Sequence, residues 1–190
     1  MLKAVFFDKD GVLNVDNGIS GTNEAVVLFP GLPEVIKSLR ERGFNIFVVT
    51  NQPIVARGII KEDTLEKILD EFKERVESND DNIKIDKIYY CPHHPHANLE
   101  EYRINCDCRK PKPGMILEAV REFNIDVKKS YMIGDRISDI IAGSLAGCKT
   151  IQILSGKHIE KMIESDIKNT EKITPDYVVK DLKEILDIIK

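Results

Sequence analysis

The sequence lacks the features that would place it in a membrane or on a nucleic acid. No apolar run approaches the roughly 18 residues that span a bilayer, and the chain begins with strand-like sequence in place of a charged segment and an apolar signal. Basic residues are not in excess, because 28 Lys and Arg stand against 32 Asp and Glu, a formal net charge of −4. Nucleic-acid binding usually needs a positive face. We therefore expect a cytoplasmic monomer that acts on a small molecule.

Internal repeats and low-complexity tracts are also absent, and 190 residues suffice for one core but scarcely for two. We expect a single domain over residues 1–190. Residues 32–42, which Gly43 follows, and residues 61–76 have helical periodicity. The runs that suit buried strands are 4–7, 46–49, 88–90, 131–133, 150–153 and 177–179. Strands separated by helices predict a three-layer α/β fold with a mainly parallel central sheet.

Polar side chains follow three of these runs. Asp8 and Asp10 come after the first strand, residues 50–52 after the second, and Asp135 and Asp139 after the fourth. Any one of them could be a helix cap or a turn residue. Because ligands bind beyond the carboxyl ends of parallel strands, three such clusters predict one shared site.

A second group of polar residues lies in a long irregular stretch, residues 91–113. The pairs Cys91-x-His93 and Cys106-x-Cys108 supply three thiolates and an imidazole, enough for a closed structural zinc site. Two further histidines lie close by, and free thiols in a polar loop are the alternative. We expect Zn²⁺, because the stretch has no core of its own and a metal would order it.

Several segments together resemble a known family. The segments are Asp8-Lys9-Asp10-Gly11-Val12-Leu13, Val49-Thr50-Asn51-Gln52, Lys110, and Gly134-Asp135 with Asp139. In order and spacing they resemble the four motifs of the haloacid dehalogenase superfamily, whose phosphatases pass through an aspartyl phosphate. The resemblance extends to about Ile153, and Val12 stands where the family usually has Thr. It implies a Rossmann-like fold and a phosphatase.

The resemblance also implies roles for the carboxylates. Asp8 would be the nucleophile, and Asp10 would act as general acid and base. Asp8, the Asp10 main-chain carbonyl and Asp135 would hold Mg²⁺, which neutralises the phosphate dianion as the carboxylate attacks it. Asp139 would be a further ligand or a partner of the ligands.

Donors and cations at the same edge would bind the substrate. By resemblance Thr50 and Asn51 would hydrogen-bond the transferring phosphoryl oxygens, and Lys110 would add positive charge where negative charge gathers. Asp8, Asp10, Thr50 and Lys110 thus form the expected catalytic set. Further expected substrate-binding residues are Asp16, Gly18, Gln52, Arg57 and Arg109.

The metal-binding stretch narrows the resemblance. Its Cys-x-His and Cys-x-Cys-Arg-Lys-Pro pattern resembles the zinc-containing branch that holds the D-glycero-D-manno-heptose 1,7-bisphosphate 7-phosphatases and the histidinol-phosphate phosphatases. The position used in these phosphatases matches His93 rather than His94 or His96. Twelve residues separate His93 from Cys106, a longer link than in the histidinol enzymes. The resemblance therefore implies hydrolysis of the 7-phosphate of the heptose bisphosphate.

Some alternatives stay open. The substrate could be histidinol phosphate or another small sugar phosphate, and a zinc-stabilised binding module would need only the loop. Arg109 could bind the second phosphate of a bisphosphate in bidentate fashion or merely form a surface ion pair. Pro53-Ile54-Val55 stands where the family usually has Ser-Gly-Ile, next to the expected substrate site. No large cap domain is expected, so loops would close the site.

Overall fold

The computed structural model describes residues 1–15, 27–77, 80–154 and 173–190. In this part of the chain six strands form one sheet in which all neighbouring pairs are parallel. The strands are β1 (Lys3–Phe7), β2 (Phe44–Asn51), β3 (Lys87–Cys91), β4 (Tyr131–Gly134), β5 (Lys149–Ile153) and β6 (Tyr177–Val179). The α-helices are α1 (Leu32–Glu41), α2 (Glu62–Glu77), α3 (Gly114–Phe123), α4 (Ile137–Ala146) and α5 (Ile185–Ile188). The 3-10 turns are η2 (Glu100–Tyr102), η3 (Val127–Lys129) and η5 (Leu182–Glu184).

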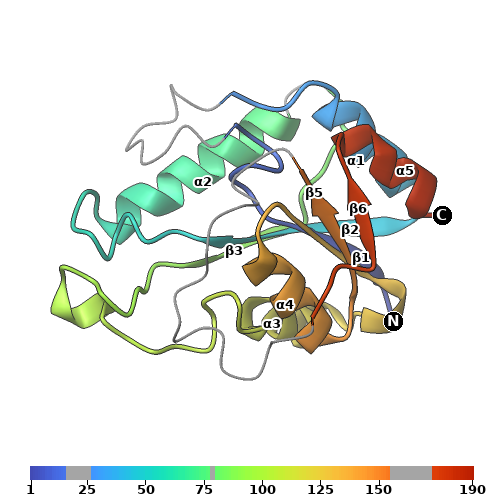
Figure 1. The fold of residues 1–190 in the computed structure, drawn as a ribbon. Helices are drawn as coiled ribbons and strands as arrows, with labels where there is room; N and C mark the ends of the chain where they lie inside the picture. Colours follow the sequence, from blue (N-terminus) through green and yellow to red (C-terminus); the bar gives the residue numbers. More distant parts are fainter. Residues whose placement is uncertain (16–26, 78–79, 155–172) are drawn as a thin grey trace.

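Helices cover both faces of the sheet. Figure 1 shows α1, α2 and α5 on one face and α3 and α4 on the other. Because successive side chains of a strand point to opposite faces, Val5 and Phe7 of β1 pack with the first group of helices, and Ala4 and Phe6 with the second. A parallel sheet buried on both faces needs strands that are apolar on both faces. The predicted three-layer α/β fold is therefore confirmed.

The two helices that the periodicity indicates are present, with ends close to those expected. α1 ends at Glu41 rather than Arg42, and Gly43 follows with a φ of 79°, the left-handed conformation that stops a helix. α2 begins and ends one residue later than the expected 61–76. Within the described ranges, every helix is too short or too polar to cross a membrane.

The strands are also those that were expected, but β2 is longer. Thr50 and Asn51 pair with Tyr90 and Cys91 of β3, so they belong to β2 and do not follow it. The prediction that the polar cluster starts after this strand is therefore wrong by two residues. Parallel pairing extends the strand through polar residues that periodicity alone assigns to a loop.

The strand order places the polar loops together. The order β3-β2-β1-β4-β5-β6 changes direction between β1 and β4, and ligands bind beyond the carboxyl ends of the strands at such a point. Asp8 follows β1 and donates its main-chain N–H to the carbonyl of Ile133 in β4 at 2.9 Å. Asp135 follows β4 directly. The residues after β1 and β4 and the end of β2 therefore share one edge of the sheet.

Candidate active site and metal centre

Three buried carboxylates meet at this edge. Oxygens of Asp8, Asp135 and Asp139 lie within 4.8 Å of one another. The Lys110 ammonium lies 2.8 Å from Asp8 Oδ1 and 2.7 Å from Asp139 Oδ1. Like charges held this close resist joint ionisation, and one ammonium balances only one of them. This set of oxygens suits a divalent cation such as Mg²⁺.

The crowding changes the titration of these groups. Burial raises the pKa of Asp8 to about 7, helped by the charges of Asp139 and Asp135 and opposed by Lys110. Burial alone would lower the pKa of Lys110. The charges of Asp139 and Asp8 have a larger effect in the opposite direction, so the pKa is raised. The lysine is therefore charged, whereas burial favours the protonated form of Asp8 when no metal is bound. A cation among the carboxylates would favour the ionised form of Asp8.

Two glycines allow this close approach. Gly11 has a φ of 88°, and a Cβ added to it would lie 2.7 Å from Asp135 Oδ2. A Cβ on Gly134 would lie 2.1 Å from Cβ of Asp139. Both gaps are too small for a side chain, and the φ of Gly11 disfavours any other residue. Glycine is therefore required at both positions for the carboxylates to meet.

Asp10 has partners of its own. Its Oδ1 accepts hydrogen bonds from Lys9 Nζ at 2.6 Å and Asn14 Nδ2 at 3.0 Å, and its Oδ2 accepts one from Gln52 Nε2 at 2.9 Å. Burial alone would raise the pKa of Asp10. The contacts with Lys9, Asn14 and Gln52 have a larger effect, so the pKa lies below the ordinary value of an aspartate. Without a metal the proton therefore lies preferentially on Asp8 and the charge on Asp10, the reverse of what a nucleophile and a general acid need, so a cation among the carboxylates would have to favour ionised Asp8.

The amide of Asn51 fixes the backbone of Lys110. Asn51 Nδ2 donates to the Lys110 carbonyl and Asn51 Oδ1 accepts from the Lys110 N–H, both at 3.0 Å. Lys110 Nζ also donates to the Val49 carbonyl at 2.7 Å. The structure thus places the Asn51 side chain against Lys110, and its expected contact with phosphoryl oxygens stays a prediction. Thr50 is buried and its Oγ1 accepts from Gln52 Nε2 at 3.0 Å.

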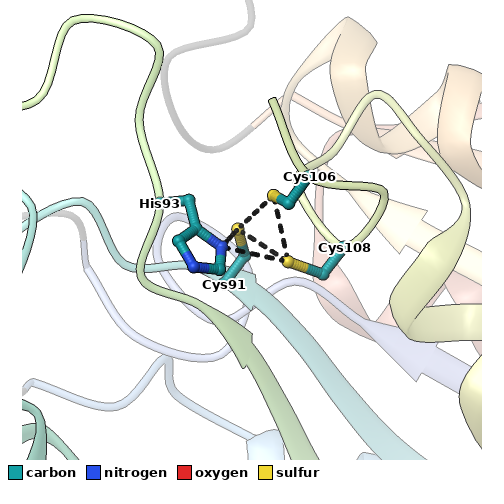
Figure 2. Close-up of side chains that lie close together, drawn as sticks. All are labelled: Cys91, His93, Cys106 and Cys108. Carbon is teal, nitrogen blue, oxygen red and sulfur yellow. Dashed lines mark hydrogen bonds between the residues drawn. The ribbon is translucent and has the colours of Figure 1, made fainter. Parts of the chain in front are cut away.

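The second cluster is formed by Cys91, His93, Cys106 and Cys108, which face one another in Figure 2. Cys108 Sγ lies 3.1 Å from the Sγ atoms of Cys91 and Cys106, and Cys91 Sγ lies 3.5 Å from Cys106 Sγ. Nδ1 of His93 is 3.5 Å from Cys108 Sγ and 3.8 Å from Cys91 Sγ. A tetrahedron with Zn–S bonds of about 2.3 Å has edges of about 3.8 Å. The four ligand atoms therefore match a small tetrahedral metal site.

The thiols of this cluster differ in acidity. All of them are free cysteines. The hydrogen bond shared with Cys91 lowers the pKa of Cys108 to about 5, whereas burial raises the pKa of Cys106. The cluster therefore favours one thiolate without a metal. Metal binding would displace protons from the other thiols.

The metal-binding loop, residues 91–113, is attached to the other functional residues. Cys91 pairs with Asn51 across the sheet, and its carbonyl accepts from the Gln52 N–H at 2.8 Å. Arg109 Nη1 donates to the His93 carbonyl at 3.0 Å, and Lys110 follows directly. Both half-sites of the cluster thus lie next to residues of the carboxylate site.

The loop after β2 lies between α2 and the metal-binding loop. Ile54 and Val55 are buried against leucines of α2. Two of the residues that stand in place of the family's Ser-Gly-Ile therefore have a packing role. The Ala56 carbonyl accepts the N–H of Asn98 at 3.0 Å, and the Arg57 carbonyl accepts from Asn98 Nδ2 at 3.1 Å. Arg57 itself is exposed. The loop therefore presents Arg57 from a fixed backbone.

Most of the expected site residues are brought together, and some new ones appear. Asp16 and Gly18 lie outside the described residues. Reasoning from the sequence missed Lys9 and Asn14 as partners of Asp10. The available signal was a lysine between two aspartates, but sequence alone does not tell which carboxylate it pairs with.

Comparison with known proteins places this geometry in a family. A family model described as "HAD-hyrolase-like" matches residues 107–185. The D-glycero-beta-D-manno-heptose-1,7-bisphosphate 7-phosphatase of Haemophilus ducreyi is 40% identical over 158 residues, which are 83% of this chain and 86% of that protein. The protein of the same name from Escherichia coli K12 is 36% identical over 188 residues, 98% of this chain and 93% of that protein.

A solved structure agrees with these relatives. The D,D-heptose 1,7-bisphosphate phosphatase from B. bronchiseptica, complexed with magnesium and phosphate, superposes with a TM-score of 0.80 at 26% identity. The match covers 98% of this chain and 97% of that one. The chain therefore belongs to the HAD-like hydrolase family and is a phosphoric monoester hydrolase. Its relatives in that family include heptose-1,7-bisphosphate 7-phosphatases.

Proposed function

We propose that this protein hydrolyses the 7-phosphate of D-glycero-D-manno-heptose 1,7-bisphosphate through an aspartyl phosphate. The observation that carries the proposal is the name shared by relatives that are 36% and 40% identical over most of the chain. The site supports it, because the Asp8, Lys110 and Asp135 set suits phosphoryl transfer and the Cys/His cluster matches the zinc-containing branch. The zinc-stabilised binding module is disfavoured, because it would need no carboxylate site.

The chain's own residues account for both steps of the reaction. In the first, Asp8 Oδ attacks phosphorus, the bond from phosphorus to the sugar oxygen breaks, and protonated Asp10 gives its proton to the leaving alkoxide. In the second, ionised Asp10 takes a proton from water as the water oxygen attacks phosphorus. The bond from phosphorus to Asp8 breaks, inorganic phosphate leaves, and both aspartates return to their starting forms.

The remaining residues stabilise charge and bind metals. Asp8, Asp135 and the Asp10 carbonyl would hold Mg²⁺, with Asp139 as ligand or partner, and the bound ion would neutralise charge on the transferring phosphoryl group. Thr50 and Lys110 would contact that group as charge develops. A closed Zn²⁺ site at Cys91, His93, Cys106 and Cys108 would order the loop.

The rest of the sugar bisphosphate would lie against the loops. Arg109, attached through the His93 carbonyl to the cluster, would bind the second phosphate from a fixed position. Arg57 would supply a further cation from the loop after β2. Asn51 and Gln52 would complete the substrate contacts, together with Asp16 and Gly18.

The proposal is tested by comparing two substrates. We expect kcat/KM for D-glycero-D-manno-heptose 1,7-bisphosphate, measured with Mg²⁺, to exceed that for histidinol phosphate by about 10³-fold, which is about 4 kcal/mol of transition-state discrimination. A ratio near or below one would assign the substrate to the histidinol branch. Equal, low values for both would indicate another small sugar phosphate, and no turnover of any phosphate ester would favour the binding module.

Arg109→Ala is expected to raise KM for the bisphosphate at least about tenfold, on the scale of 1.5–3 kcal/mol for a hydrogen bond to a charged group. KM for p-nitrophenyl phosphate, which has no second phosphate, should change little. Arg121→Ala on the exposed end of α3 is the matched control. Equal increases of KM for both substrates would show that Arg109 acts on the loop and not on the second phosphate.

A further inference from the structure

Lys9 is a buried cation that has no role in the reaction proposed above. Its side chain is 8% exposed, and its Nζ lies 2.6 Å from Asp10 Oδ1 and 3.3 Å from Asn14 Oδ1. The same Nζ lies 5.3 Å from the ring centroid of Phe72 in α2. A buried lysine is costly unless it is paired. The stability gained from this buried ion pair therefore does not by itself explain why a lysine lies beside Asp10.

The backbone around Lys9 brings its partners together. The Lys9 carbonyl accepts the N–H groups of Leu13 at 2.9 Å and Asn14 at 3.2 Å, and Gly11 N–H donates to the Asn14 carbonyl at 2.7 Å. This tight turn returns the Asn14 side chain to Asp10 and Lys9. The arrangement is fixed by the main chain and does not depend on a flexible surface group.

The three donors divide unequally between the two oxygens of Asp10. A carboxylate offers about four lone-pair positions, two on each oxygen. Lys9 and Asn14 occupy both positions of Oδ1, whereas Gln52 occupies one position of Oδ2. Among the contacts of the described residues, Oδ2 is thus the oxygen with room for a proton or a substrate.

The same hydrogen bonds place Oδ2 beside the expected phosphoryl site. Gln52 Nε2 lies 2.9 Å from Asp10 Oδ2 and 3.0 Å from Thr50 Oγ1, so one amide joins the two groups. Thr50 is an expected contact of the transferring phosphoryl group. A proton on Oδ2 would therefore lie next to the oxygen that leaves.

We propose that Lys9 is a positioning residue that fixes Oδ1 of Asp10, so that Oδ2 carries the proton to the leaving oxygen. The inference rests on the proposed function, because it uses Asp10 as the general acid. Without the Lys9 contact, Asn14 alone holds Oδ1, so the carboxylate can turn more freely about its last torsion and the proton-carrying oxygen is held less firmly beside the substrate. An alkoxide needs that proton, whereas p-nitrophenolate leaves without it.

The test compares kcat/KM for two esters, because kcat/KM reports the steps up to release of the alcohol. In Lys9→Met we expect kcat/KM for the heptose bisphosphate to fall by about 10- to 100-fold, part of the 10²–10⁴-fold that a general acid supplies. The value for p-nitrophenyl phosphate should change by less than about threefold. Lys9→Arg should recover most of the loss, because it keeps the charge. Lys67→Met, exposed on α2, is the matched control.

Other outcomes overturn the inference. Equal losses on both esters would show that Lys9 only supports the fold, and no loss on either would show that Asp10 needs no such contact. Lys9→Gln is measured alongside, with the thermal unfolding of each variant, so that the comparison is made on folded protein. Failure of the proposed function is seen separately, as absent wild-type turnover of the heptose bisphosphate. The same ratio is then measured with whichever sugar phosphate the wild type hydrolyses.

Discussion

Asp8→Asn is expected to lower kcat by at least about 10⁴-fold, on the scale seen when an enzyme loses its nucleophile. The amide has nearly the same shape as the carboxylate but cannot form the aspartyl phosphate. Steady-state kinetics with the heptose bisphosphate and with p-nitrophenyl phosphate measure the loss. Both esters should be affected alike, because both need the nucleophile.

The same substitution is expected to stabilise the metal-free protein above neutral pH. The folded-state pKa of Asp8 is raised to about 7, so the folded chain binds a proton that the unfolded chain has lost. Stability contributed by this group therefore falls as pH rises from about 4 to about 7, and the penalty is complete above pH 7. Asp8→Asn should remove that dependence in thermal unfolding with a chelator present.

Controls separate these two effects of Asp8. Asp187→Asn, exposed on α5, should leave both activity and the pH profile of stability unchanged. Added Mg²⁺ should raise the unfolding temperature of the wild type more than that of Asp8→Asn, because the variant lacks one expected ligand charge. Near-full turnover by Asp8→Asn would remove Asp8 from the role of nucleophile.

The sheet could be predicted from the sequence because its strands are buried on both faces. Such strands are nearly continuous apolar runs, and the runs at 4–7 and 131–133 fall inside β1 and β4. Asp8 and Asp135 could be assigned to one edge because parallel strands end together. The end of β2 was harder to predict from the sequence, because Thr50 is polar and belongs to the strand only through its pairing with β3.

The partners of the site residues could not be predicted, because they depend on side-chain direction. Lys9 lies between two aspartates in the sequence, yet it pairs with Asp10, while Lys110 pairs with Asp8 from more than 100 residues away. The amide of Asn51 binds the Lys110 backbone, a contact that the sequence did not indicate, while its expected contact with the phosphoryl group stays a prediction. Contacts between distant segments carry no periodic signal.

Cys106→Ser is expected to release zinc and to destabilise the protein strongly. A ligand present at about 1,000 times its Kd stabilises the folded state by about 4 kcal/mol. At about 2–4 °C per kcal/mol for a chain of this size, loss of the metal should lower the unfolding temperature by about 10 °C. Metal analysis should find about one zinc per chain in the wild type and far less in the variant.

Activity should fall with the zinc, because the loop carries Lys110, a proposed catalytic residue. Lys110 lies two residues after Cys108 and contacts Asp8 and Asp139, so disorder at Cys108 should reach the carboxylate site. His93→Ala should reproduce the loss of zinc and of kcat, whereas His96→Ala should retain both. Cys148→Ala, at a buried thiol that is not among the four clustered ligands, controls for the loss of a thiol. Wild-type zinc content and stability in both Cys106→Ser and His93→Ala would show that these four residues do not hold the metal.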